Sequence, residues 1–194
     1  MKAVLPQLSR RAVLTSAAGV AVTWLAPTPL SAQSDRPVEV VAELPQARLL
    51  GSGRLSFFGL QIYDARLWVD DRFDAAAFAA APLALELEYR RTLYGKQIAQ
   101  RSLDEMKRVG GFSESQGQSW LASMLALFPD VRQGDRLTGL LRPDEAARFF
   151  LNGKPLGDVR DGEFARRFIG IWLSPQTSEP KLRSALLGLK TNPP

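Results

Sequence analysis

A clean alternation of apolar and polar residues covers positions 83–89. Leucines and a tyrosine occupy the odd positions, and alanine or glutamate the even ones. Because successive side chains of a strand point to opposite faces of its sheet, this pattern predicts a strand with one buried face. Glu86 and Glu88 are then expected on the face turned to water, although two acids on one strand face are also a group that could hold a cation.

Other extended runs predict further strands at positions 38–41, 47–58, 60–69, 135–141, 147–151 and 154–159. In the run over 60–69, one face carries Tyr63, Ala65 and Leu67, so this face is expected to meet helices rather than water. Asn152-Gly153 separates the last two runs and is a strong signal for a tight hairpin.

Helical periodicity follows in two blocks. The predicted helices are a short one at 74–80, a long one at 95–109, one from Ser113 toward Pro129 with a capping box, one around 164–172, and one at 180–189. From position 47 on, the main elements are ordered β-β-β-α-α-β-β-β-α-α. Strands and helices in separate blocks predict the α+β class, here an antiparallel sheet with helices packed on one face.

The first 32 residues are typical of an export signal. Arg10 and Arg11 precede an uncharged, mostly apolar run over 12–26, and small residues lead to Ala32. Adjacent arginines favour the twin-arginine route into the periplasm, with cleavage after Ala32. An uncleaved membrane anchor is the alternative, but the run is shorter than the roughly 20 residues of a spanning helix. We therefore expect a leader at 33–43, one domain at 44–190, and no membrane span after cleavage.

Composition excludes several kinds of chemistry. The chain of 194 residues contains no histidine and no cysteine, which excludes disulfides, thiol nucleophiles, iron–sulfur clusters and imidazole catalysis. We expect no cofactor and no metal. Lys2, Arg10 and Arg11 account for three of the 25 basic residues, so the remainder carries 22 basic and 20 acidic side chains. This near balance does not indicate a nucleic-acid partner.

Three segments together resemble the chalcone isomerase family. They are Ile62-Tyr63-Asp64-Ala65-Arg66-Leu67-Trp68, Gly95-Lys96-Gln97, and Asn152-Gly153-Lys154-Pro155-Leu156. The similarity is greatest to the bacterial chalcone isomerase-like branch and covers roughly Leu44 to Leu189. It implies an open sandwich, in which an antiparallel sheet has helices over one face and a ligand cleft between the two layers.

The catalytic positions of that family are mostly replaced here. The resemblance places Tyr63, Ile98, Glu105 and Gly157 where true isomerases have threonine, tyrosine, asparagine, and serine or threonine. Arg54 lies near the position of their arginine. Losing hydroxyl and amide donors of this kind costs on the order of a hundredfold each in rate. The resemblance therefore implies a non-catalytic domain.

Plant members without isomerase activity resemble fatty-acid carriers, in which an arginine and a tyrosine hold the carboxylate. By this resemblance Arg54 and Tyr63 are expected to bind the anionic head of a small apolar ligand such as a fatty acid, with Ile98 and Glu105 in the same cleft. Arg54 paired with a surface acid, and Tyr63 satisfied locally within the core, are the simpler alternative.

Two other functions stay open at this point. One is an intramolecular lyase or isomerase with an altered site made of Arg54, Tyr63, Lys96 and Glu105. The other is an interaction protein of the cell envelope, in which bulky side chains fill the cleft.

Overall fold

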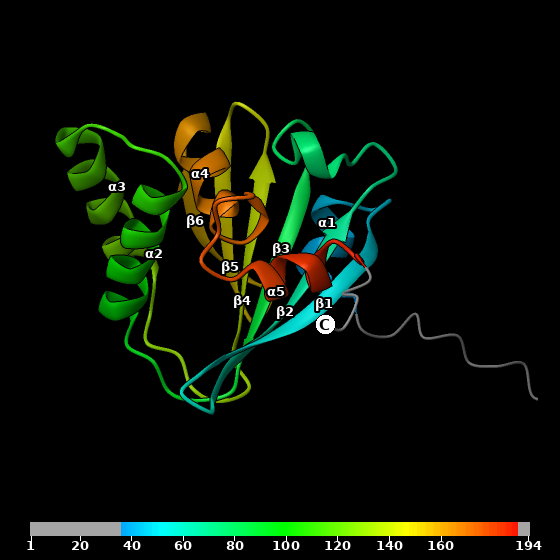
Figure 1. Ribbon diagram of the computed structural model, residues 1–194, viewed down its shortest axis with the longest axis horizontal. Helices are drawn as coiled ribbons and strands as arrows, with labels where there is room; N and C mark the ends of the chain where they lie inside the picture. Colours follow the sequence, from blue (N-terminus) through cyan, green and yellow to red (C-terminus); the bar gives the residue numbers. More distant parts are fainter. Residues whose placement is uncertain (1–35, 190–194) are drawn as a thin grey trace, which may run out of the picture. The chain divides into compact units, whose positions relative to one another are not determined.

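The computed structural model describes residues 36–189 (Figure 1). Arg10, Arg11 and Ala32 of the predicted export signal lie outside these residues. The strands are β1 (Arg48–Phe57), β2 (Leu60–Val69), β3 (Leu83–Tyr89), β4 (Arg136–Arg142), β5 (Ala146–Leu151) and β6 (Lys154–Val159). The helices are α1 (Val38–Glu43), α2 (Gly95–Val109), α3 (Glu114–Leu127), α4 (Gly162–Leu173) and α5 (Pro180–Leu186), with a 3₁₀ turn at Ala75–Ala77.

The strands form one antiparallel sheet in which sequence neighbours are also spatial neighbours, in the order β1-β2-β3-β4-β5-β6. Tyr63 of β2 stands opposite Tyr89 of β3, and Leu87 of β3 stands opposite Leu137 of β4. Helices α2 and α3 pack against each other, α4 packs on β4 and β5, and α5 packs on β1. The α+β class with an antiparallel sheet is thus confirmed.

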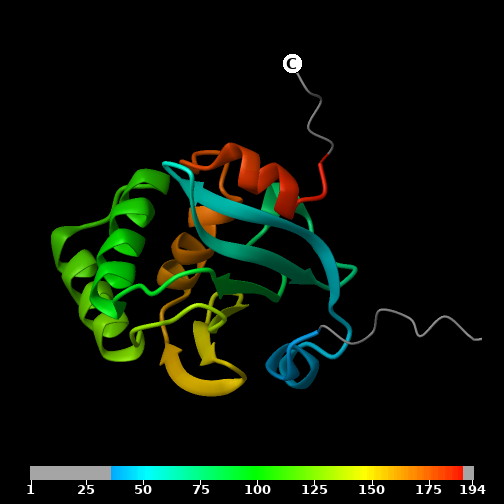
Figure 2. The same cartoon turned by 90° about the horizontal axis from the view of Figure 1, so that it is seen from below.

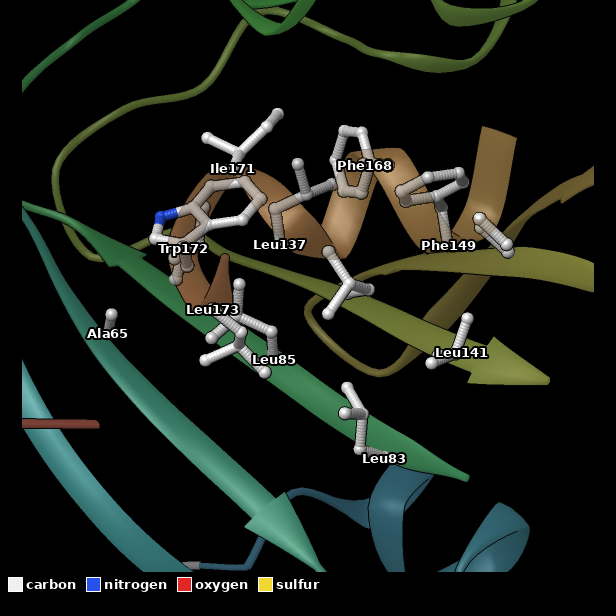
Figure 3. Packing of buried hydrophobic residues seen from close by; sticks show 14 of the residues in the cluster. Ala65, Leu83, Leu85, Leu137, Leu141, Phe149, Phe168, Ile171, Trp172 and Leu173 are labelled. Atoms are coloured by element: carbon white, nitrogen blue, oxygen red, sulfur yellow. The ribbon is translucent and has the colours of Figure 1, made fainter. Parts of the chain in front are cut away.

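The main core lies between the sheet and these helices. As predicted, the face of β2 that carries Ala65 and Leu67 is fully buried there. Phe149 of β5 and Phe168 of α4 meet edge-on, with ring centroids 5.1 Å apart, and Figure 3 shows the two rings near each other beside α4. Among the described residues, every helix is too short or too polar to cross a membrane.

Two local predictions hold in detail. Asn152 and Gly153 have φ angles of 51° and 83° between β5 and β6, as a tight hairpin turn requires. Ser113 Oγ accepts a hydrogen bond from the Gln116 backbone N–H at 3.2 Å, while Gln116 Oε1 accepts one from the Ser113 N–H at 3.1 Å. This reciprocal pair is the predicted capping box at the start of α3.

The prediction of a strand over positions 38–41 is wrong, because this segment is helix α1. Val40 packs there against Trp68 and Ala84, on the face of the sheet opposite the main core; Figure 2 shows α1 on that side. The β-branched residues of the segment favour a strand locally, but burial of Val40 outweighs that preference. One short helix therefore covers part of the second face.

Glu86 also differs from its prediction, since it is fully buried rather than turned to water. Its carboxylate accepts hydrogen bonds from Arg66 Nη1 at 2.7 Å and from Trp68 Nε1 at 3.0 Å. Burial raises the pKa of Glu86, and the neighbouring arginines oppose that shift. The acids of this face are thus matched by arginines from adjacent strands, with Arg66 also bound to Glu88 at 3.0 Å.

Candidate functional site

A cavity of about 370 Å³ lies between the sheet and helices α2 and α4. Its apolar wall is formed by Leu55, Ile62, Leu87, Leu137, Phe168 and Ile171. Leu55, Leu87 and Leu137 point toward the helices because they lie on the core-facing side of their strands. Ile62 lies at the register shift between β1 and β2, where the regular alternation is interrupted. Figure 3 shows Leu137, Phe168 and Ile171 gathered on this side of the sheet. The space is therefore a gap between the two layers that their side chains leave unfilled.

Two tyrosines on neighbouring strands bring hydroxyl groups into this apolar wall. The rings of Tyr63 and Tyr89 meet edge-on with centroids 6.0 Å apart, and both line the cavity. Tyr63 Oη accepts a hydrogen bond from Trp172 Nε1 at 2.9 Å, so its own O–H is free to donate. Burial raises the pKa of both phenols well above the ordinary value. They therefore stay protonated and act as donors at neutral pH.

Helix α2 supplies two charged groups of the cavity, Arg101 and Glu105. Ile98, Arg101, Ser102 and Glu105 all line it, because spacings of three, four and seven residues place them on one face of the helix. Glu105 is only 5% exposed, and its Oε1 lies 2.7 Å from Arg101 Nη2. Its Oε2 is buried without a hydrogen-bond partner in the described part of the chain, although Arg108 Nε lies 3.4 Å from it.

The cavity reaches the surface near the start of α2. Its lining includes the exposed residues Phe57, Gln97 and Ser178, and the Arg101 side chain is 67% exposed. Glu179 also lines this region and, like Glu105, raises the pKa of Tyr63, whereas Arg101 lowers it. An apolar interior with a few charged and hydroxyl groups toward one side is the usual composition of a small-molecule site.

The structure brings Tyr63, Ile98 and Glu105 together in the cavity, as the sequence predicts, but places Arg54 elsewhere. Arg54 and Leu55 are neighbours on β1, so their side chains point to opposite faces of the sheet. Leu55 faces the cavity, and Arg54 binds Asp64 on the other face, with Nη2 2.9 Å from Oδ2. The expectation that Arg54 reaches into the cleft therefore needs correction.

The simpler alternative describes both residues correctly. Asp64 accepts hydrogen bonds from Arg54 and Arg90, and these bonds lower its pKa to about 2. Tyr63 is satisfied locally by Trp172. Lys96 does not line the cavity either, so the altered enzymatic site of Arg54, Tyr63, Lys96 and Glu105 is not assembled in it.

Sequence reasoning missed Arg101, Ser102, Tyr89 and Glu179. Helical spacing was sufficient to find the first two, because they stand three and four residues after Ile98. Tyr89 is the last residue of β3 and shares its face with Leu87, so it was detectable from strand alternation. Glu179 comes from the segment between α4 and α5, and its place at the cavity depends on how that segment folds back.

Comparison with known proteins agrees with this architecture. The family model for chalcone isomerase-like proteins matches residues 34–188. An uncharacterized protein of Haemophilus influenzae is 36% identical over 107 residues, which are 55% of this chain and 52% of that protein; the match thus spans about half the length of this relative. The crystal structure of AtFAP1, a fatty-acid binding protein of Arabidopsis thaliana, covers 73% of this chain and 87% of its own with a TM-score of 0.58.

The identity to that structure is 15%, so the similarity concerns the fold. The family match extends over most of the chain and includes every strand of the sheet and the residues that line the cavity. On this basis, the chain belongs to the chalcone isomerase-like family.

Proposed function

We propose that this domain binds a small apolar ligand with a polar head, such as a medium-chain fatty acid, and performs no chemistry on it. The observation that carries the proposal is the unfilled cavity of about 370 Å³ between the sheet and α2 and α4. This volume falls within the roughly 300–1,000 Å³ of small-molecule sites. A cleft that served only for packing would be filled by bulky side chains, since protein interiors are close-packed.

The polar head of the ligand is best placed near Arg101 and the two phenols. Arg101 is the cation among the residues of 36–189 that line the cavity. Its guanidinium has five N–H donors, so it can bind a second carboxylate while it keeps Glu105. The hydroxyls of Tyr63 and Tyr89 add neutral donors deeper in the wall. In this arrangement Arg101 binds the anionic head of the ligand, which is the role that the sequence suggested for Arg54.

Two further observations support binding without catalysis. Ile98 adds an aliphatic side chain to the cavity where isomerases of the family have a tyrosine hydroxyl. The Arabidopsis protein of similar fold is a fatty-acid binding protein. Both favour a carrier in which one charged anchor and an apolar space suffice.

A cavity-filling substitution tests this proposal. Ile98→Trp places an indole in the space, whereas Leu125→Trp adds the same group to an exposed position of α3 that does not line the cavity. Dodecanoic acid is expected to raise the Tm of the parent and of Leu125→Trp, because binding to the folded state stabilises it. Ile98→Trp is expected to lose this shift and to bind at least tenfold more weakly in calorimetry. Equal shifts for all three proteins would place the fatty acid outside the cavity and overturn the proposal.

We also propose that the chain is exported to the periplasm by the twin-arginine route. The adjacent Arg10 and Arg11, the weakly apolar run after them and the small residues before position 33 support this.

A further inference from the structure

The β1–β2 hairpin ends in an exposed apolar tip formed by Phe57, Phe58 and Leu60, here called the aromatic tip. These residues are 60%, 89% and 54% exposed, respectively. The rings of Phe57 and Phe58 contact each other edge-on with centroids 4.5 Å apart. Large side chains grouped in this way at the end of a hairpin leave apolar surface in water without contributing to the core.

The turn of this hairpin holds Phe58 in an unfavourable backbone conformation. Phe58 has a φ of 47° and Gly59 a φ of 76°, and a two-residue turn with both φ angles positive favours Asn-Gly. A bulky residue in the left-handed region costs free energy. Phe58 is 89% exposed, so its packing recovers little of that cost. The ring is therefore better explained by a contact outside the domain than by the stability of the hairpin.

Basic side chains surround this end of the sheet. The start of β2, the end of β3 and the start of β4 lie together, at the lower end in Figure 1. The loops that follow β3 and precede β4 are joined by the Leu93–Val131 bridge, and they expose Arg91, Lys96 of the adjoining α2, and Arg132.

Two acidic side chains of these loops accept hydrogen bonds from backbone N–H groups. Asp130 Oδ1 accepts from the Gly95 N–H at 2.8 Å, and Asp135 Oδ2 accepts from the Arg132 N–H at 2.7 Å. Asp130 is exposed, but the exposed cations Arg91, Lys96 and Arg132 outnumber it on these loops.

We propose that the aromatic tip docks on a lipid bilayer that contains anionic phospholipid. Apolar rings at the tip can enter the interfacial region, while the neighbouring Arg and Lys side chains meet phosphate groups, and these are the two attractions that hold peripheral proteins at membranes. The tip is a projecting turn, so it offers little of the roughly 800 Å² that a stable protein partner covers. Phe57 also lines the cavity, so docking brings the cavity mouth next to the bilayer.

The absence of cysteine allows the tip to be probed at a single position. Ser56→Cys places an environment-sensitive fluorophore at the tip, and Ser52→Cys places the same fluorophore on the same face of β1, about 13 Å away along the strand. Both serines are exposed. With vesicles of phosphatidylcholine and phosphatidylglycerol at 3:1, the Ser56 probe is expected to shift to shorter wavelengths and to be quenched by brominated lipid, and the Ser52 probe is not.

Phe58→Ser in the Ser56-labelled chain tests the ring itself. Its vesicle affinity, read from the probe, is expected to fall about five- to tenfold. Arg132→Gln is expected to lower the affinity for the anionic vesicles about fivefold and to leave binding to pure phosphatidylcholine unchanged. Because the probe reports only its own surroundings, vesicle binding by the N-terminal apolar run does not produce these changes.

Three outcomes would overturn the docking. The first is an equal response of the two probes to vesicles, and the second is a Ser56 response that Phe58→Ser leaves unchanged. The third is a spectral shift that depends on protein concentration without vesicles, because this would indicate a second copy of the chain as the partner. Phe58 does not line the cavity, so the Phe58 variant is expected to bind dodecanoic acid normally. The docking and the proposed ligand binding can thus fail independently.

Discussion

Tyr63 and Tyr89 are paired across β2 and β3, yet their hydroxyls have different surroundings. Tyr63 Oη accepts the hydrogen bond of the buried Trp172 indole. Burial and the nearby Tyr63 raise the pKa of Tyr89, and within residues 36–189 its hydroxyl makes no hydrogen bond to the protein. The Tyr63 hydroxyl therefore supports the fold as the acceptor of Trp172, which still leaves its O–H free to donate, whereas the Tyr89 hydroxyl is available to a ligand both as donor and as acceptor.

Removing each hydroxyl separately is expected to distinguish these roles. Tyr63→Phe leaves the Trp172 N–H without its acceptor, so the free energy of unfolding in urea is expected to fall by about 1–2 kcal/mol. Tyr89→Phe is expected to change stability by less than about 0.5 kcal/mol and to weaken dodecanoic acid binding. Similar stability losses in the two variants would contradict this assignment.

Asp64 is expected to make stability depend on pH in the acid range. Hydrogen bonds from Arg54, together with those from Arg90, lower its pKa from 3.8 to about 2 in the folded protein. The stabilisation is therefore complete above about pH 4 and is lost as the pH falls from 4 to 2. Since Arg54 is 44% exposed, solvent screening reduces the effect to about 1 kcal/mol.

The measurement compares Asp64→Asn with Asp71→Asn in urea unfolding between pH 2 and pH 7. Asp71 pairs with Arg48 but is 96% exposed, so its substitution is expected to have little effect. The loss of stability in Asp64→Asn is expected to be full at pH 7 and to be strongly reduced at pH 2, where Asp64 of the parent is about half protonated. If Asp64→Asn lost as much unfolding free energy at pH 2 as at pH 7, the charge of the carboxylate would not be the cause of the loss.

The face of the sheet to which each strand residue points was only partly predictable from the sequence. Alternation correctly placed Tyr63 on the cavity side, because its neighbours in the pattern are apolar. Arg54 was selected through family resemblance, and a difference of one position along a strand moves a side chain to the other face of the sheet. The burial of Glu86 was not predictable either, because its partners Arg66 and Trp68 belong to another strand and α1 covers the region.

At the scale of the elements, helix α1 depends on contacts with distant parts of the chain. Val40 is fully buried against the sheet. Glu39 Oε1 accepts from Thr138 Oγ1 at 2.7 Å, and Glu43 Oε1 accepts from Arg148 Nη1 at 2.7 Å. Six residues are too few to form a stable helix alone, so the sheet surface determines this structure and the local sequence does not.

Val40→Ala is expected to reduce the free energy of unfolding by about 2 kcal/mol, because it removes two buried methyl groups from the contact with Trp68 and Ala84. Val41→Ala is the matched control, since Val41 is 44% exposed and its loss is expected to cost less than about 0.5 kcal/mol. Urea unfolding followed by circular dichroism measures both. Equal costs for the two neighbours would mean that α1 contributes little through its buried face.

For the whole molecule, the order of strands and helices was predictable because each long element has its own periodicity and ends at a turn or cap. The cavity was not predictable from the same patterns. Whether Leu137 and Phe168 touch or leave a space depends on how far apart the sheet and α4 lie, and that distance is set by all the side chains between them.

The location of the protein is tested through its arginine pair. Changing both Arg10 and Arg11 to Lys is expected to retain the precursor in the cytoplasm, because the twin-arginine route depends on these side chains. Cell fractionation with detection of the domain measures this. Changing Lys2 to Arg is the matched control and is expected to leave export unchanged. Normal periplasmic accumulation of the double-lysine variant would contradict the proposed route.

The open sheet leaves β1 and β6 as outer strands, and both are unsuited to pairing with another chain. The pairing of β1 with β2 shifts register twice, between Leu49 and Gly51 and between Leu55 and Ser56. β6 contains Pro155, which has no N–H to donate, and its pairing with β5 shifts between Phe149 and Phe150. The irregular pairing of β1 and Pro155 in β6 interrupt the rows of donors and acceptors that an extended peptide would need at these edges. This disfavours edge-to-edge aggregation at high concentration.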